Sequence, residues 1–168
     1  LVHHEEAREI LAPIGFEMDR EVTGVWNDAE TDYRCKLRGD NVDDVTATLT
    51  DVKTTRNASP TAFSRSLWEF AIYRQLAWYD SGFEALDRPM TSHIIVAVER
   101  RYPNLVAVYR IPDYLITMGR REAHALKRRL VECGEQDDWP SFTEGIVTLD
   151  LNRWDMTKLV DLYGDLEK

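Results

Sequence analysis

Apolar and polar residues alternate through the first third of the chain, with the period of two that marks strands with one buried face. Such runs cover residues 21–26, 33–42 and 45–53. The polar segment 27–31 separates the first two runs, so we expect a hairpin followed by a third strand. A short helix over residues 3–11 should precede them and end near Pro13 and Gly15.

The pattern changes at Ser59-Pro60, where a good N-cap residue is followed by a proline suited to the first helical turn. We expect one long helix from there to about Asp80, closed by Gly82. Its apolar residues include Phe63, Leu67, Phe70, Ala71 and Trp78.

The second half of the chain repeats this alternation of strands and helices. We expect strands over 92–98 and 105–111, a helix from Pro112 to about Val131, and a terminal helix over 155–166. The order helix, three strands, helix, two strands, two helices predicts an α/β domain with a β-sheet flanked by helices. Because the hairpin strands come first, the sheet should be mixed rather than all parallel.

Length, charge and cysteine content narrow the class of protein. The 168 residues fit one domain, 1–168. No apolar run is long enough for a membrane span and no secretory leader opens the chain, so we expect no membrane partner and a cytoplasmic protein of a bacterium or a phage-infected host. Cys35 and Cys133 have no metal-binding spacing, which argues against an iron–sulfur site.

The net charge of −9 argues against a broad basic surface, but not against local basic patches or a carboxylate-rich metal site. The densest basic cluster lies in a helical pattern, which favours a solvated helix face. Its members are Arg120, Arg121, Lys127, Arg128 and Arg129.

Candidate chemistry begins with Asp51-Val52-Lys53 at the end of the third predicted strand. Side chains alternate along a strand, so Asp51 and Lys53 should share a face. A carboxylate beside an ammonium group can bind a divalent metal ion and position a nucleophilic water. Taken alone, the triplet favours a simple ion pair at a strand end, and this alternative stays open.

Asp40 lies eleven residues before Asp51, with the turn-like residues 41–44 between the two strands. Antiparallel pairing would bring both aspartates to one end of the sheet. Together with the backbone carbonyl of Val52, they would form the oxygen-rich site that Mg²⁺ and Mn²⁺ prefer. Asp40 also fits an ordinary turn residue.

A third element lies on the long helix, where Gln75 and Tyr79 are four residues apart and share a face. An amide among apolar neighbours needs a hydrogen-bond partner. Gln75 therefore fits either a functional residue or a structural glutamine whose hydrogen bonds are satisfied.

Taken in order, these elements resemble the exonuclease VIII (RecE-type) branch of the PD-(D/E)XK nucleases. The resemblance spans roughly residues 17–154. It rests on the stretches CKLRGD at 35–40, DVKTT at 51–55, Ala58-Ser59-Pro60 with Phe63, Tyr73-Arg74-Gln75 with Tyr79, and the segments 139–142 and 149–154.

The resemblance implies a restriction-endonuclease-like core and a role for each matching residue. Asp40 and Asp51 would be metal ligands, completed by the Val52 carbonyl. Lys53 would steer the attacking water and stabilise charge on the phosphate. Gln75 and Tyr79 would orient the site and touch the nucleic acid.

Five further residues are candidates for DNA contact. Thr54 and Thr55 would lie near the site by the same resemblance. Three arginines around the long helix could contact phosphates, although plain surface charges are an equally good interpretation. These are Arg56, Arg65 and Arg74.

Two positions depart from the family pattern. Gly39 stands where the family usually has proline before the first aspartate. The family also carries an upstream helix with a motif histidine, which we expect to be absent here because Asp40 is so close to the start. A substitute carboxylate could come from Glu5, Glu6, Glu9 or Glu21.

The sequence therefore predicts a Mg²⁺- or Mn²⁺-dependent DNA exonuclease of phage-type recombination. The resemblance implies 5′-to-3′ polarity, a homo-oligomer and a single-strand annealing partner. Two alternatives stay open: a non-catalytic nucleic-acid- or protein-binding module on the same fold, and a structural protein in which the motif arises by chance.

Overall fold

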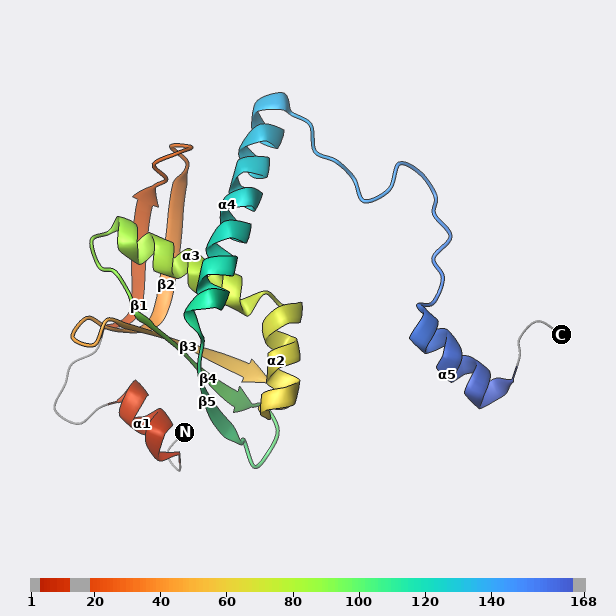
Figure 1. Ribbon diagram of the computed structural model, residues 1–168, viewed down its shortest axis with the longest axis horizontal. Helices are drawn as coiled ribbons and strands as arrows, with labels where there is room; N and C mark the ends of the chain where they lie inside the picture. Colours follow the sequence, from red (N-terminus) through yellow and green to blue (C-terminus); the bar gives the residue numbers. More distant parts are fainter. Residues whose placement is uncertain (1–3, 13–18, 165–168) are drawn as a thin grey trace. The chain divides into compact units, whose positions relative to one another are not determined.

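The computed structural model describes residues 4–12 and 19–164, and Figure 1 shows the arrangement of its helices and strands. Contacts divide the chain into two units, residues 1–132 and 133–168. A single domain over the whole chain stays a prediction. Among the described residues, no helix combines the length and the apolar character needed to cross a bilayer.

The first unit is built on one five-stranded sheet with the strand order β1-β2-β3-β4-β5. β3 and β4 are parallel, and every other neighbouring pair is antiparallel. The strands are β1 Asp19–Asn27, β2 Arg34–Asp43, β3 Thr48–Thr55, β4 Ser92–Glu99 and β5 Val106–Arg110. The expected α/β fold with a mixed sheet flanked by helices is thus confirmed.

The parallel pair β3 and β4 requires a crossover connection, which two helices provide. They are α2 Pro60–Glu69 and α3 Ile72–Ala85, and in Figure 1 α3 crosses the β1–β2 hairpin. The prediction of one continuous helix was wrong. Ala71 adopts a left-handed conformation with φ 48°, which breaks the helix, and Phe70 beside it is 68 % exposed.

Gly82 does not close the helix, because α3 continues to Ala85. The glycine is buried, and a Cβ atom there would lie 2.5 Å from the Leu37 side chain and 2.7 Å from the Trp26 ring. Gly82 therefore serves the close packing of α3 on the β1–β2 hairpin rather than a helix cap.

The core fills the space between the sheet and the crossover helices. Leu49 and Ile95 of the sheet meet Leu76 and Phe83 of α3 in one cluster of buried side chains. Burial of such side chains is the main driving force for folding. α1 Glu5–Leu11 adds its fully buried Ala7.

The remaining helices are α4 Asp113–Gln136 and α5 Arg153–Tyr163. α4 begins where expected and extends five residues beyond the predicted end at Val131. α5 belongs to the second unit and is capped by Asn152, whose side chain accepts from two backbone N–H groups. The predicted ends at His3 and Leu166 lie outside the described residues.

Candidate active site

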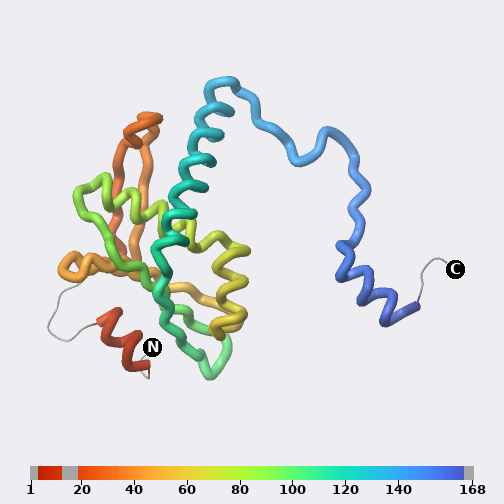
Figure 2. The backbone as a smooth tube through the Cα atoms, in the orientation of Figure 1, coloured from red at the N-terminus to blue at the C-terminus, as the bar shows by residue number. Residues whose placement is uncertain are grey.

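β2 and β3 pair only near the turn that joins them, from Asp43–Thr48 to Asn41–Thr50. In the same register the next pair would be Asp40–Asp51, and the pairing ends before it. Beyond this point β2 continues beside β1 and β3 continues beside β4. Figure 2 shows the backbone of the β1–β2 hairpin leaving the rest of the sheet. We call this point of separation, with Asp40 and Asp51 on its two strands, the fork.

Asp40 bridges the fork. Its carboxylate accepts a hydrogen bond of 2.8 Å from the backbone N–H of Val52, which has no β2 partner in the ladder there. The N–H and C=O of an extended residue point to the same neighbouring strand. The Val52 carbonyl should therefore also face the fork, where the predicted metal site needs it.

Asp51 lies on the other edge of the fork and is only 2 % exposed. Its Oδ2 atom is 2.5 Å from the Lys53 Nζ. Within the described residues, this buried oxygen accepts no hydrogen bond of good geometry. Burial raises the pKa of Asp51. Lys53 partly offsets that rise, and the negative charge of Asp40 adds to it. The two aspartates thus interact electrostatically across the fork.

The two strands present their side chains to different hollows. Asp40 lines a hollow of about 410 Å³ together with Val52 and Ala7 of α1. Lys53 lines a second hollow of about 640 Å³, which we call the Lys53 hollow, against α2 and the start of α3. Asp40 and Lys53 therefore line different hollows beside the fork.

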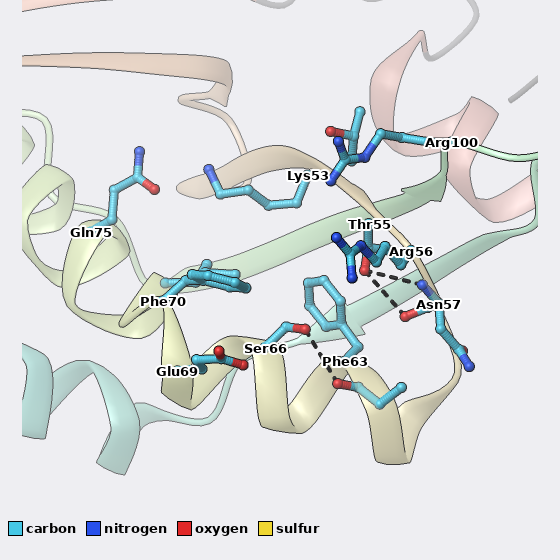
Figure 3. A pocket seen from close by; sticks show the side chains of 13 residues that line it. Lys53, Thr55, Arg56, Asn57, Phe63, Ser66, Glu69, Phe70, Gln75 and Arg100 are labelled. Atoms are coloured by element: carbon cyan, nitrogen blue, oxygen red, sulfur yellow. Dashed lines mark hydrogen bonds between the residues drawn. The ribbon is translucent and has the colours of Figure 1, made fainter. Parts of the chain in front are cut away.

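Gln75 and Lys53 both line the Lys53 hollow, and Figure 3 shows the ends of their side chains turned toward the same space. The Gln75 amide donates a hydrogen bond of 2.8 Å to the Tyr79 hydroxyl. Tyr79 thus supplies the partner that the glutamine needs, and itself packs against the core. The structure brings Gln75 to the hollow, and its role there stays a prediction.

Residues 4–152 match a family described as a PDDEXK-like domain of unknown function (DUF3799). The chain belongs to this family. The match covers the fork, the crossover helices and the start of the second unit, so the PD-(D/E)XK resemblance is confirmed at the level of the superfamily.

One solved structure supports the fold of this PDDEXK-like domain, and a second is weakly similar. A crystal structure from Eubacterium rectale, of a protein named "Putative exonuclease", has a TM-score of 0.57 and 10 % identity over 94 % of this chain and 66 % of that chain. A crystal structure of SSO0001 has a TM-score of 0.43 and 20 % identity over 73 % of this chain and 55 % of that one. The chain thus spans less than two thirds of either protein. No curated protein matches it.

Three of the five residues predicted to contact DNA line the Lys53 hollow of the PDDEXK-like domain: Thr54, Thr55 and Arg56. The other two lie elsewhere. Arg65 is exposed on α2 outside the lining of this hollow, and Arg74 makes an ion pair of 3.4 Å with Glu122.

The basic cluster expected on a helix face lies on α4, where three of its five members make ion pairs with acidic residues. Arg120 pairs with Asp80 and Glu84, Lys127 pairs with Asp28, and Arg128 lies 3.9 Å from Glu30.

None of the four proposed substitute carboxylates lines the hollow that holds Asp40. Glu5, Glu6 and Glu9 are exposed on α1, and Glu21 makes an ion pair of 2.5 Å with Arg38. Within residues 4–12 and 19–164, no three His, Cys, Asp or Glu side chains form a group that could hold a metal ion.

Sequence reasoning missed Arg100, which lines the Lys53 hollow beside Arg56. Arg100-Arg101 directly follows β4, and the register pairs Thr55 with Glu99 in the parallel ladder. The dipeptide was visible in the sequence, but only the parallel pairing brings it beside Arg56.

Gln75→Ala is expected to slow nucleic-acid cleavage, the reaction typical of nucleases of this superfamily, on the order of 10²-fold, the typical cost of misplacing a reacting group. It removes one neutral hydrogen bond, so unfolding should become easier by only about 1 kcal/mol. Cleavage rates and thermal melts measure the two effects. Gln136→Ala is the matched control, since this glutamine is exposed at the end of α4. If Gln75→Ala melts several degrees lower and keeps full activity, Gln75 has a structural role and not a catalytic one.

Proposed function

We propose that this PDDEXK-like domain is a Mg²⁺- or Mn²⁺-dependent DNA exonuclease that hydrolyses phosphodiesters of linear duplex DNA. The observation that carries the proposal is the fork, where Asp40, Asp51 and Lys53 gather at the end of the β2–β3 pairing. The resemblance to the exonuclease VIII branch and the name of the E. rectale protein support the finer activity.

The residues at the fork fit a small divalent cation. Asp51 carries a buried oxygen with unused acceptor capacity, Asp40 supplies a second carboxylate, and the Val52 carbonyl is a third oxygen. Mg²⁺ usually retains several waters and needs only one or two protein carboxylates. When bound, the ion would polarise the phosphoryl oxygen and lower the pKa of a water molecule.

Lys53 supplies the charge that the transition state requires. Water attacks phosphorus, a new P–O bond forms, one P–O ester bond breaks, and the leaving oxygen takes up a proton. Negative charge grows on the phosphoryl oxygens during this step, and the ammonium group beside Asp51 is held in place to stabilise it. Its side chain is 24 % exposed, so the group is accessible yet partly shielded from water.

The Lys53 hollow would hold the strand beside the cleaved bond. Gln75 lies beside Lys53 with its amide oriented by Tyr79, and Thr55 and Arg56 line the wall toward the end of β3. Positioning of this kind accounts for much of the rate that such an enzyme needs, because hydrolysis involves few protein groups.

Comparing linear and circular duplex DNA tests the proposal. The full chain with Mg²⁺ or Mn²⁺ should degrade the linear form, leave the closed circle intact, and stop on addition of a chelator. Nicking of the circle would instead assign an endonuclease. The absence of any cleavage with either ion would contradict nuclease activity.

One observation favours a second function, a non-catalytic nucleic-acid-binding module. The described residues offer two carboxylates at the fork but no group of three acidic or histidine ligands. DNA binding that persists without divalent ions, combined with no cleavage, would support this alternative. Association with a single-strand annealing protein and self-association remain proposals that rest on the resemblance. A cytoplasmic location remains a proposal that rests on the sequence pattern alone.

A further inference from the structure

Three arginines gather where β3 and β4 end. The two strands are parallel and Thr55 pairs with Glu99, so Arg56 and Arg100 emerge side by side at one edge of the sheet. The Arg100 backbone N–H donates a hydrogen bond of 3.0 Å to the Thr55 carbonyl, which holds the two strand ends together. Arg101 follows directly. We call Arg56, Arg100 and Arg101 the arginine cluster.

The arginine cluster forms a hollow of its own, of about 480 Å³, lined by these three residues. Arg56 and Arg100 also line the Lys53 hollow, so the two hollows are neighbours that share these two residues. Figure 3 shows Arg56 and Arg100 at one side of the Lys53 hollow, with Lys53 and Gln75 toward the other. A strand that follows this path would pass from the fork to the arginine cluster.

No ion pair involves any member of the arginine cluster within the described part of the chain. The neighbouring Glu99 carboxylate accepts instead from the backbone N–H of Ala58, at 2.8 Å. Some arginines elsewhere, such as Arg38, Arg88 and Arg120, contact acidic side chains, and others on the exposed surface that the structure describes do not. What distinguishes the arginine cluster is that its three members line one hollow. In a protein of net charge −9, three adjacent unpaired guanidinium groups indicate a site for an anion.

Phosphate groups match this cluster best. Guanidinium groups bind phosphate oxygens through paired hydrogen bonds, and charge on both partners strengthens those bonds. An anion would also relieve the repulsion between the three cations.

We propose that the arginine cluster binds one phosphodiester group of the DNA strand that enters the fork, an inference that rests on the proposed function. This group is not the one that is cleaved. Arg56 follows Lys53 by three residues, which is roughly 10 Å at about 3.3 Å per residue of strand. Phosphates on one strand of a duplex follow each other by about 3.4 Å along its axis. The bound group therefore lies a few nucleotides from the cleaved bond.

The test is the salt dependence of DNA binding by the full chain in a chelator, where no cleavage occurs. Arg100→Gln with Arg101→Gln should lower affinity for a short linear duplex at least about tenfold, since charge-assisted hydrogen bonds are lost. The slope of log affinity against log salt should become shallower by about 0.9, the contribution of one phosphate. Arg121→Gln with Arg129→Gln removes the same charge from exposed positions of α4 and should change neither quantity.

Unchanged affinity and slope in the Arg100/Arg101 variant would overturn the proposal, as would an equal loss in the α4 control. Inorganic phosphate serves as the second probe. If it binds the wild type through Arg100 and Arg101 while DNA affinity does not depend on them, the cluster is a small-anion site and the proposal fails. Because binding is measured without divalent ions, a protein that binds DNA through these arginines but never cleaves it would contradict the proposed nuclease alone.

Discussion

Replacing Lys53 with alanine is expected to slow DNA hydrolysis on the order of 10²–10³-fold, as the loss of one preorganised charge-stabilising group typically does. The Lys53 Nζ lies 2.5 Å from Asp51 and lines the hollow proposed to hold the strand. Ammonium groups are not metal ligands, so the variant should still bind Mn²⁺. The fold should persist because the side chain is partly exposed and contributes little apolar burial.

Cleavage rates at saturating DNA, beside calorimetric titration with Mn²⁺, measure these two effects. Lys158→Ala is the matched control, because this lysine is exposed on α5 and makes an ion pair of 3.4 Å with Asp155. If Lys53→Ala cleaves DNA at the wild-type rate, the catalytic role of Lys53 is wrong, and Asp51-Val52-Lys53 holds only an ordinary ion pair at a strand end.

Asp51→Asn is expected to abolish metal-dependent cleavage for a different reason. The substitution keeps the shape of the side chain and removes the charge that would hold the cation. Changing a residue that only hydrogen-bonds to a metal ligand weakens metal binding by up to about 10²-fold. Asp51 would be a ligand itself, so metal affinity should fall by more than that. Titration with Mn²⁺ should therefore distinguish the two variants: Asp51→Asn should bind the ion weakly, whereas Lys53→Ala should bind it normally and still cleave slowly.

The same variant should be more stable than the wild type when no divalent ion is present. Burial raises the pKa of Asp51 in the folded state, so folding favours the protonated carboxyl. Its contribution to stability is full below the ordinary aspartate pKa and is lost as the pH rises through the raised folded value. Asparagine resembles the neutral form at every pH.

Thermal unfolding of both proteins in a chelator, at pH 4 and at pH 8, measures this linkage. The melting temperature of Asp51→Asn should exceed that of the wild type at pH 8, and the two should converge toward pH 4. A variant that is less stable at pH 8 would show that the ion pair with Lys53 outweighs the burial of the Asp51 charge.

Local pattern was enough to predict most of the secondary structure and the closeness of Asp51 to Lys53. Alternation defined the strands of the hairpin and β3, and it placed Asp51 and Lys53 on one face, where the structure pairs them. The eleven-residue spacing between Asp40 and Asp51 predicted an antiparallel turn between their strands, and β2 and β3 do pair antiparallel as far as Asn41–Thr50. These features depend on neighbours in sequence, which the sequence displays directly.

Helix details failed where packing overrides local preference. Nothing in the residues around Ala71 marks a break, yet its left-handed conformation ends one helix and begins the next. Gly82 looked like a helix stop, but the ring of Trp26 and the side chain of Leu37 leave no room for a Cβ atom there. Both outcomes depend on the hairpin against which α3 packs.

The sequence by itself determined the strands, their order, the mixed sheet and the pairing of Asp51 with Lys53, because each follows from periodicity and short spacing. Only the tertiary structure decided two further features. One is the point where the β2–β3 pairing ends and the fork opens, and the other is the position of Arg100 beside Arg56. The second depends on a parallel ladder between segments more than forty residues apart. Such a ladder is specified by the burial of whole strands and by the crossover helices, not by the residues that it brings together.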